Sequence, residues 1–389
     1  MYTCPSCHNL LEVDYDFGSI AESVDKQVLS SRNLRSMWRY REFLPVDRFE
    51  EVTLEEGFTP ISKSTKLKAQ LGLGGMYFKH EFTSPTGSFK DRGSVVLVTR
   101  AKELGFTGVS IDSSGNAAAS LATYCARAGL QCNVFMPSYA SASKLIQCAV
   151  ADAVVVKVNG TRQQTYEVAN KATAKLRLFY CGFQTNSFSS EGMKTIGYEI
   201  CEQFNWDPPD WIVFPVGTGS GLVGCFKGLK ELKQLGWIDH LPSMVCVQPE
   251  GCAPISHAAK AGQSIAEPVE KPASIAEGLL ISKPLRGTQV LSVLAETRGL
   301  AESVTEAEIE KAAKLLMSSE GLFVEPSSAV SLAGLVKLVE NGRIGRDDDA
   351  LCMLTGSGLK TYSFYQKSLK EPIEVDPDAD LQNVLKIAS

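Results

Sequence analysis

From about residue 108 onward, short apolar runs alternate with stretches of helical periodicity. In chain order these segments read VSID, NAAASLATYCARAG, CNVFMP, SASKLIQCAVA, AVVVKV and TRQQTYEVANKATAKL. Such alternation is typical of a parallel sheet that is covered by helices on both faces. The rhythm returns in EGMKTIGYEICEQF, WIVFPVG, LVGCFKGLKELKQLG and SMVCVQPEG, which predicts a second doubly wound sheet. We therefore expect an α/β protein with two open parallel-sheet domains and a ligand cleft between them.

The spacing of these segments predicts the domain boundaries. Two separate stretches are expected to form the larger domain, and the stretch between them is expected to form the smaller one. The expected ranges are 51–95 with 186–370 for the larger domain, 96–185 for the smaller, 1–50 for an N-terminal extension and 371–389 for a C-terminal tail. Within the larger domain, Thr305 and Glu308 are spaced as a capping box. They predict a helix that ends at Gly321.

Composition narrows the class of partner. The chain has 389 residues, of which 44% are hydrophobic, so it can bury two cores. Its net charge is -5 and its Lys and Arg residues are scattered, which leaves no basic face for nucleic acid or a membrane surface. No apolar run reaches the roughly 18 to 20 residues that span a bilayer, and the first residues lack the features of a signal peptide. We expect a cytoplasmic protein that binds a small molecule.

The cysteines predict neither disulfides nor a metal site. Eleven cysteines, an odd number, lie mostly inside apolar segments, where a free thiol behaves as a small hydrophobe. Cys4 and Cys7 form one CxxC followed by His8, whereas a zinc ribbon needs two such pairs. We therefore expect no metal at this motif.

The segment SPTGSFKDRG, residues 84–93, places one lysine in an unusual setting. A lysine that attacks a carbonyl must be deprotonated, and burial or a neighbouring positive charge favours the neutral form. We expect this segment to supply both effects for Lys90. The alternative interpretation is a solvated lysine at the start of a helix.

Three glycine-marked turns follow predicted strands. Ser113, Ser114, Gly115 and Asn116 lead into a helix, where backbone N–H groups suit an anion such as a carboxylate, although an ordinary N-cap is the alternative. The turn GTGSG (Gly217, Thr218, Gly219, Ser220, Gly221) can fold around a phosphate, and a tight structural turn is its alternative. The third turn, LTGSGLK at 354–360, places Thr355 at the carboxyl end of a strand, where ligands bind in doubly wound sheets.

A phosphate cradle together with one activated lysine predicts a particular cofactor. Pyridoxal phosphate carries an aldehyde that a lysine can bind and a phosphate that a glycine loop can hold. It acts as an electron sink for carbanions at amino-acid substrates. We therefore expect an enzyme that acts on amino acids.

Eight segments resemble a known family in their order along the chain. They read MWRYREFLPV, EGFTP, SPTGSFKDRG, SSGNAAAS, EGMKT, PVGTGSG, EGLFVEPSSA and LTGSGLK. This ordered set resembles the threonine synthases and their relatives among the fold-type-II pyridoxal phosphate enzymes, whose fold is similar to that of tryptophan synthase β. The resemblance covers most of the chain. It implies a cytoplasmic lyase of amino-acid biosynthesis that is commonly a homodimer.

The resemblance implies a role for each site residue. Lys90 matches the Schiff-base lysine, Asn116 the residue beside the cofactor's 3-hydroxyl, and Thr355 the hydroxyl that faces the pyridine nitrogen. Gly217 to Gly221 match the phosphate cradle, and Ser113 to Asn116 match the loop that holds the substrate α-carboxylate. The implied reaction converts O-phospho-L-homoserine and water to L-threonine and phosphate. A neutral hydroxyl at the ring nitrogen would favour elimination and replacement over transamination.

The sequence departs from the family where the substrate phosphate is expected to bind. Ser189 stands where an arginine is expected, Thr218 where an asparagine is expected, and Ala117 where a threonine is expected. Loss of a guanidinium removes the strongest bidentate partner of a dianion. Two readings follow. Either Lys79, Ser84 or Arg92 compensates as a substrate ligand, or the enzyme acts on another substrate.

Two alternative functions therefore stay open. The first is a pyridoxal phosphate lyase or β-replacement enzyme that acts on serine, threonine or O-phosphoserine, and SIAEGL at 274–279 suits that group as well. The second is a catalytically silent relative that keeps the cofactor and binds a partner or senses an amino acid. The intact Lys90 and Asn116 argue against the silent relative.

Overall fold

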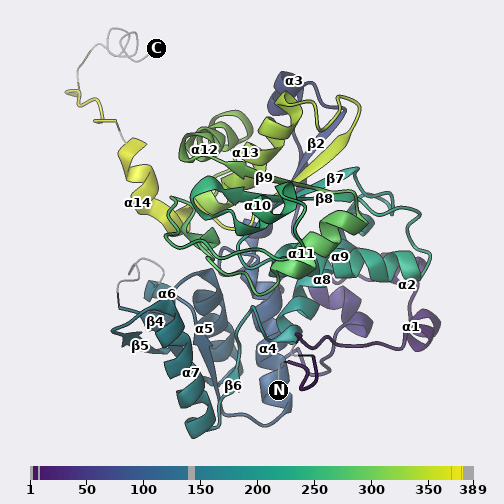
Figure 1. Ribbon diagram of the computed structural model, residues 1–389, viewed down its shortest axis with the longest axis vertical. Coiled ribbons are helices and arrows are strands. Elements are labelled where there is room, and N and C mark those ends of the chain that lie inside the picture. The colour runs from purple at the N-terminus through teal and green to yellow at the C-terminus, as the bar shows by residue number, and fades with distance from the viewer. Residues whose placement is uncertain (1–2, 8, 139–144, 369, 378, 380–389) are drawn as a thin grey trace.

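The computed structural model describes residues 3–7, 9–138, 145–368, 370–377 and 379, and these residues form two sheets (Figure 1). In the larger sheet the strand order is β1-β2-β10-β7-β8-β9, and only the pair β1 and β2 is antiparallel. Its strands are β1 (Ile61–Lys63), β2 (Gly75–Lys79), β10 (Asp349–Met353), β7 (Trp211–Pro215), β8 (Ser243–Pro249) and β9 (Leu300–Val304). The prediction of two mainly parallel α/β sheets is confirmed.

Alternating residues of the larger sheet face two different hydrophobic cores. On β7, Ile212 and Phe214 belong to one core with helices α8, α9 and α11, whereas Val213 belongs to the other with α12 and α13. This period of two is what a strand buried on both faces requires. The helices around this sheet are α3 (Lys66–Leu71), α8 (Ser187–Gln203), α9 (Ser220–Gln234), α10 (Pro254–Lys260), α11 (Gly287–Glu296), α12 (Glu306–Glu320), α13 (Pro326–Glu340) and α14 (Tyr362–Tyr365).

The smaller sheet is wholly parallel and forms the lower part of the molecule in Figure 1. Its strand order is β5-β4-β3-β6, with β5 (Val154–Val158), β4 (Gln131–Pro137), β3 (Gly108–Asp112) and β6 (Phe179–Tyr180). The associated helices are α4 (Lys90–Glu103), α5 (Asn116–Ala128), α6 (Leu145–Val150) and α7 (Arg162–Leu176). Helix α4 packs on both α5 and α8, so it joins the elements of the two sheets.

The strongest sequence signals correspond to observed elements. The runs VSID, CNVFMP and AVVVKV form β3, β4 and β5, and the helical segments that follow each of them form α5, α6 and α7. Residues 141–144 of the expected segment SASKLIQCAVA lie outside the described residues. The capping box is confirmed: Thr305 accepts from the backbone of Glu308, whose side chain accepts from the backbone of Thr305, and the helix ends at Gly321.

The N-terminal fifty residues contribute to the core. They contain α1 (Phe17–Ser23), α2 (Lys26–Ser31) and the 3-10 helix Met37–Phe43. Trp38, Tyr40 and Phe43 are almost completely buried and join the core that contains α8 and α9. The 3-10 helix of this segment therefore packs against α8.

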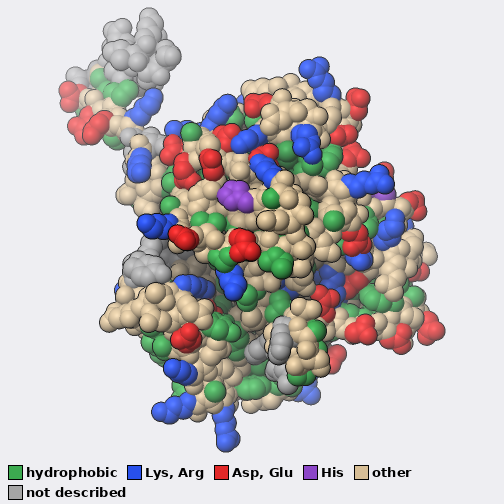
Figure 2. All heavy atoms as spheres, viewed as in Figure 1, with side chains coloured by type: hydrophobic (Ala, Val, Ile, Leu, Met, Phe, Trp, Pro, Cys, Tyr) green, Lys and Arg blue, Asp and Glu red, His purple; other side chains and the backbone are tan. Residues whose placement is uncertain are grey.

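The surface matches the balanced composition. On the face shown in Figure 2, acidic and basic side chains are interspersed. Among the residues that the structure describes, no helix is both long and apolar enough to cross a bilayer. Nine of the eleven cysteines are buried, and all eleven are free thiols.

Candidate active site around Lys90

Lys90 is the first residue of α4, and its side chain lies against two aromatic rings. Nζ lies 4.4 Å from the ring centre of Phe89 and 5.1 Å from that of Phe183. Burial lowers the pKa of Lys90 to about 8, and the nearby carboxylate of Glu325 partly opposes this shift. The expected effect of burial is therefore confirmed. The expectation of a neighbouring positive charge is wrong, because the charged group that acts on Lys90 is Glu325.

The loop before Lys90 is hydrogen-bonded to the turn after β10. The backbone N–H of Phe89 donates to the carbonyl of Thr355 at 3.0 Å, and that of Ser357 donates to the carbonyl of Gly87 at 2.9 Å. Two of the segments singled out in the sequence, 84–93 and 354–360, therefore lie side by side.

Asn116 and Glu325 meet beside this loop. Asn116 Nδ2 lies 3.1 and 3.2 Å from the two carboxylate oxygens of Glu325, which is 2% exposed. The backbone N–H of Glu325 donates to the carbonyl of Gly356 at 2.9 Å. Asn116 Oδ1 is buried and has no hydrogen-bond partner among the described residues. An unpaired buried acceptor indicates that a donor from a bound molecule belongs there.

The start of α5 has the geometry of an anion site. Gly115 occupies the N-cap position and no side chain caps the helix, so the interpretation of this motif as an ordinary Ser or Asn cap is wrong. Ser113 and Ser114 are partly exposed, and Ser113 Oγ accepts only a 3.3 Å bond from the N–H of Gly115. Uncapped N–H groups at a helix N-terminus attract carboxylates and phosphates.

The loop from Gly217 to Gly221 joins β7 to α9 and depends on its glycines. Gly219 has a φ of 91°, which L side chains rarely adopt, and a Cβ there would lie 2.7 Å from Cγ2 of Val290. A Cβ on Gly221 would lie 2.9 Å from the ring of Phe89, so this loop directly adjoins the loop of Lys90. The side chains of Thr218 and Ser220 bond to each other at 2.9 Å.

We expect Gly219→Ala to weaken cofactor binding about tenfold, because a left-handed alanine costs about 1 to 2 kcal/mol and its Cβ pushes the loop from Val290. Absorbance titration of the apoprotein with pyridoxal phosphate measures this. The matched control is Gly236→Ala, which has a φ of 70° but nothing within 4 Å of its Cβ. Equal cofactor affinity in both variants would contradict a role for the loop.

Lys90, Asn116, Glu325, the turn at Thr355 and the loop 217–221 form one set of neighbouring groups, which we call the chamber. Several hydroxyl groups belong to this set. Thr355 is buried, and its Oγ1 lies 3.2 Å from Oγ of Ser328. Ser84 Oγ and Ser88 Oγ are buried and have no hydrogen-bond partner among the described residues. Ser84 therefore stays available as a substrate ligand.

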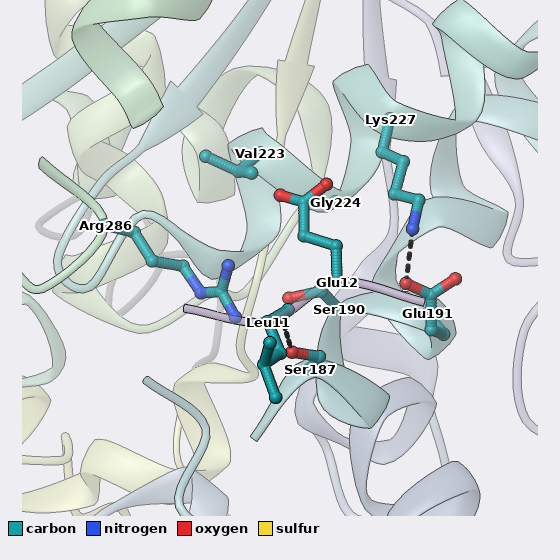
Figure 3. Close-up of a pocket in the computed structure, with 9 residues that line it drawn as sticks. All are labelled: Leu11, Glu12, Ser187, Ser190, Glu191, Val223, Gly224, Lys227 and Arg286. Carbon is teal, nitrogen blue, oxygen red and sulfur yellow. Dashed lines mark hydrogen bonds and ion pairs between the residues drawn. The ribbon is translucent and has the colours of Figure 1, made fainter. Parts of the chain in front are cut away.

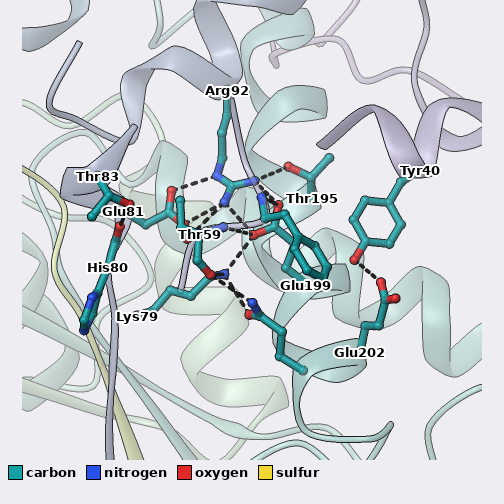
Figure 4. A network of polar contacts seen from close by, with 12 residues as sticks. Tyr40, Thr59, Lys79, His80, Glu81, Thr83, Arg92, Thr195, Glu199 and Glu202 are labelled. Carbon is teal, nitrogen blue, oxygen red and sulfur yellow. Dashed lines mark hydrogen bonds and ion pairs between the residues drawn. The ribbon is translucent and has the colours of Figure 1, made fainter. Parts of the chain in front are cut away.

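Lys79 and Arg92 lie in a separate, completely buried cluster of charges (Figure 4). The ammonium of Lys79 donates to the carbonyl of Thr59 at 2.7 Å, to Glu199 at 2.8 Å and to Gln203 at 2.9 Å. These three bonds use all its donors. Arg92 makes two bonds to Glu199 and two to Glu81, from 2.5 to 2.7 Å. The structure therefore does not bring these two cations to Lys90, and neither compensates for the expected arginine.

The substituted positions take structural roles. Ser189 is buried, and its Oγ donates to the carbonyls of Asn186 at 2.8 Å and Phe183 at 3.2 Å. Its hydroxyl therefore joins the start of α8 to the backbone of Phe183, whose ring lies beside Lys90. Ala117 is partly buried one residue into α5.

The N-terminal CxxC lies apart from these elements. Cys4 is partly exposed and Cys7 is exposed, while His8 lies outside the described residues. Within the described part of the chain, no group of three or more His, Cys, Asp or Glu residues could hold a metal ion.

The residues present fit the predicted cofactor. The chamber offers a lysine of lowered pKa, an unpaired amide oxygen on Asn116, a neutral hydroxyl on Thr355, and a loop at the start of α9 that only glycine can line closely. These are the groups that an aldehyde, a phenolic hydroxyl, a ring nitrogen and a phosphate require.

Three residues near Lys90, namely Glu325, Ser328 and Phe183, were not predicted from the sequence. Glu325 and Ser328 lie in EGLFVEPSSA but received no role there. The signal for Glu325 is an acid in an apolar stretch immediately before the proline that starts α13, since acids are rarely buried without a partner. Phe183 has no such signal.

Comparisons with known proteins show the family of the chain. The family model "Pyridoxal-phosphate dependent enzyme" matches residues 52–356. The chain is 42% identical to the threonine synthase of Methanocaldococcus jannaschii over 388 residues, which covers 99% of this chain and 94% of that protein. It is 40% identical to the threonine synthase of Methanosarcina acetivorans over 381 residues, which covers 98% and 93%.

Solved structures share the fold. Maize serine racemase matches with a TM-score of 0.70 at 21% identity, covering 80% of this chain and 91% of that chain. Serine racemase from Dictyostelium discoideum matches with a TM-score of 0.66 at 26% identity, covering 77% and 92%. The fold and the chamber thus define a pyridoxal-phosphate dependent enzyme of fold type II. Within that class the chain belongs to the threonine synthase family, a group of carbon–oxygen lyases.

Proposed function

We propose that this chain converts O-phospho-L-homoserine and water into L-threonine and inorganic phosphate. One observation carries the proposal: Lys90, Asn116, Thr355 and the loop 217–221 converge on one chamber, in a chain that matches a threonine synthase over 99% of its length. The match supports the reaction, and the chamber supports the residue roles.

Four parts of the chain would hold the cofactor. Lys90 would bind it covalently, Asn116 would accept from its 3-hydroxyl, Thr355 would face its ring nitrogen, and the loop 217–221 would hold its phosphate. Pyridoxal phosphate supplies an electron sink for negative charge at the substrate carbons. Thr355 is neutral and is paired with Ser328, so it cannot hold a proton on the ring nitrogen as a carboxylate would. This favours elimination and replacement chemistry.

Lys90 would also move protons. Its pKa of about 8 allows the amine to act as both base and acid near neutral pH. Once the substrate amine has displaced it, the same amine would move protons at Cα, Cβ and Cγ. The free N–H groups at the start of α5, with Ser113 and Ser114, would hold the α-carboxylate, and Ser84 would contact the substrate.

The charge of Glu325 would tune the pKa of Lys90 against the larger effect of burial. Because that carboxylate raises the pKa of Lys90 against the effect of burial, Glu325→Gln should lower this pKa below 8. The amide keeps an acceptor for Asn116. Neutral amine binds the aldehyde, so the rate at which the apoprotein takes up pyridoxal phosphate should rise with pH around 8 in the wild type. In the variant the same rise should occur at lower pH.

Stopped-flow absorbance of cofactor uptake between pH 6 and pH 10 measures this shift. Glu310→Gln, which removes the same charge from an exposed position of α12, is the control. If the two variants have the same profile, Glu325 does not tune Lys90.

The reaction itself is tested with purified holoenzyme and O-phospho-L-homoserine. Released phosphate and threonine should form together in equal amounts. If the cofactor is bound but neither product forms, the proposed substrate is wrong.

One alternative has a specific observation in its favour. The hydroxyl of Ser189 is committed to the carbonyls of Asn186 and Phe183, so it cannot bind a substrate phosphate in place of the expected arginine. The alternative is a β-elimination or β-replacement enzyme that acts on serine, threonine or O-phosphoserine. Serine and threonine carry no phosphate, so an enzyme that acts on them needs no such arginine. Turnover of these amino acids by holoenzyme that ignores O-phospho-L-homoserine would favour this alternative.

Assembly and location stay predictions. We propose a cytoplasmic homodimer, as is common among fold-type-II enzymes. Sedimentation velocity of the holoenzyme should give twice the mass of 42.1 kDa, and a monomer at micromolar concentration would contradict this.

A further inference from the structure

Arg286 carries a buried charge that has no ion-pair partner among the residues the structure describes. It lies just before α11 and is 2% exposed. Its Nη1 donates to Gln289 Oε1 at 3.0 Å, but Nε and Nη2 have no partner among the described residues. These two nitrogens form one edge of the guanidinium, the edge that binds an oxyanion through two parallel bonds. A cation buried in this way is costly unless an anion joins it.

Further donors face the same small pocket (Figure 3). Arg286 extends toward Ser187 and Ser190 there. Ser190 Oγ is buried and also has no partner in the described chain. Ser187 is the first residue of the 17-residue helix α8, whose N-terminus favours negative charge. Its hydroxyl donates to the carbonyl of Leu11, and the side chain of Asn186 accepts from the N–H of Phe188, so an anion would replace the Leu11 carbonyl as the partner of Ser187. The lining residues are Leu11, Glu12, Ser187, Ser190, Glu191, Val223, Gly224, Lys227 and Arg286.

The two acids of this pocket are occupied elsewhere. Glu191 is paired with Lys194 at 2.8 Å and Lys227 at 2.6 Å. Glu12 Oε1 accepts from Gln289 Nε2 at 3.0 Å. Burial lowers the pKa of Arg286, and the charges of Glu12 and Glu191 partly oppose this shift. Neither carboxylate comes within ion-pair distance of Arg286 among the described residues, so the free guanidinium edge stays available.

The pocket lies next to the cofactor loop but is separate from it. A Cβ on Gly219 would lie 3.3 Å from Cβ of Arg286, yet no residue of the loop 217–221 lines the pocket. On the chamber side, Ser189 and Ser220 both donate to the carbonyl of Phe183, whose ring faces Lys90. Ser189, Ser220 and Phe183 therefore lie between the pocket and Lys90.

We propose that Arg286, Ser187 and Ser190 form a second anion site that binds phosphate. The identity of the anion rests on the proposed function, which releases one phosphate per turnover. A tetrahedral dianion can accept both bonds of the guanidinium edge, a hydroxyl hydrogen and a helix N–H. Leu11 and Glu12 close the outer side of the pocket, so the anion displaces them as it enters. Its source is either the released phosphate or the phosphoryl group of the substrate.

Calorimetric titration of the holoenzyme with inorganic phosphate tests the site in the absence of turnover. Arg286→Met should weaken binding about ten- to a hundredfold, because charged hydrogen bonds are lost. Arg343→Met, which removes the same charge from an exposed position, should change nothing. Glu12→Gln should tighten binding, since it removes a negative charge near the anion.

Two milder variants keep the proposal testable if Arg286→Met does not fold. Arg286→Lys keeps the charge but loses the two-bond edge, and Ser190→Ala removes one donor; each should weaken phosphate binding. Binding to the wild type that none of these variants changes, or no binding at millimolar phosphate, would overturn the site.

Kinetics distinguish the two sources of the anion. If the substrate's phosphoryl group occupies the site, Arg286→Met should raise KM for O-phospho-L-homoserine, and phosphate should inhibit competitively. If released phosphate occupies it, KM should stay constant, and phosphate inhibition should be noncompetitive and weaker in the variant. If a variant loses phosphate binding but still forms threonine, the site does not hold the phosphoryl group of the substrate. That result leaves the binding of released phosphate intact. Phosphate binding at Arg286 without any threonine formation supports the site and contradicts the proposed reaction.

Discussion

Lys90→Ala should lack the visible absorption band of lysine-bound pyridoxal phosphate and should form threonine at least about ten-thousandfold more slowly. The reason is that one amine is assigned two tasks. It binds the cofactor covalently, and it moves protons at the substrate carbons. Lys79 cannot take over, because its ammonium makes three bonds in the buried cluster. Absorbance spectra and coupled phosphate and threonine assays measure both losses.

Lys102→Ala is the matched control for this prediction. Lys102 lies on the same helix, where it pairs with Glu51 at 2.6 Å on the surface. This variant should keep the absorption band and its rate. A Lys90→Ala protein that keeps the band would show that another amine binds the cofactor.

The doubly wound fold was predictable because its signals are local. Strands β3, β4, β5, β7 and β8 are apolar runs bounded by turns, and the helices between them have a clear period. Strand β9 has no such signal, since it reads LAESV and keeps Glu302 in an ion pair with Lys260 at 2.5 Å. Strand β6 is only two residues long. Their pairing depends on strands distant in sequence, so tertiary context decides them.

The site was predictable to the extent that it is built from short motifs. A lysine loop, a helix start and glycine turns each show their chemistry in a few adjacent residues. Lys79 shows the limit of such reasoning. It ends β2, and only the packing of β2 against α8 reveals that Glu199 and Gln203 use its ammonium. Glu325 and Phe183 also reach Lys90 from distant segments.

The buried charge cluster shows how the position of Lys90 is held. Arg92 lies two residues after Lys90 on α4, and its guanidinium joins Glu81 after β2 to Glu199 on α8 (Figure 4). Burial alone would raise the pKa of Glu199, but Arg92 and Lys79 lower it from 4.5 to about 2. A carboxylate with a lowered pKa stabilises the fold above its ordinary pKa, and this contribution is lost as the pH falls from about 4.5 toward 2.

Arg92→Met should lower the free energy of unfolding by about 3 to 5 kcal/mol, because it takes a cation away from two completely buried carboxylates and leaves Glu81 without one. Lys79 still contacts Glu199, but Glu81 keeps only the 2.6 Å bond from Thr59. Urea unfolding of wild type and variant at pH 7 measures the loss.

Arg100→Met is the matched control on the same helix. Its partner Glu103 lies 3.2 Å away and the arginine side chain is 34% exposed, so the loss should stay below about 1 kcal/mol. The difference in unfolding free energy between wild type and Arg92→Met should also become smaller below pH 4.5. In that range Glu199 of the wild type takes up a proton, so the wild type begins to lose the ion pair that the variant already lacks. A variant as stable as the wild type would mean that the carboxylates take up protons at little cost, and that packing of α4 on α8 holds Lys90 without these charges.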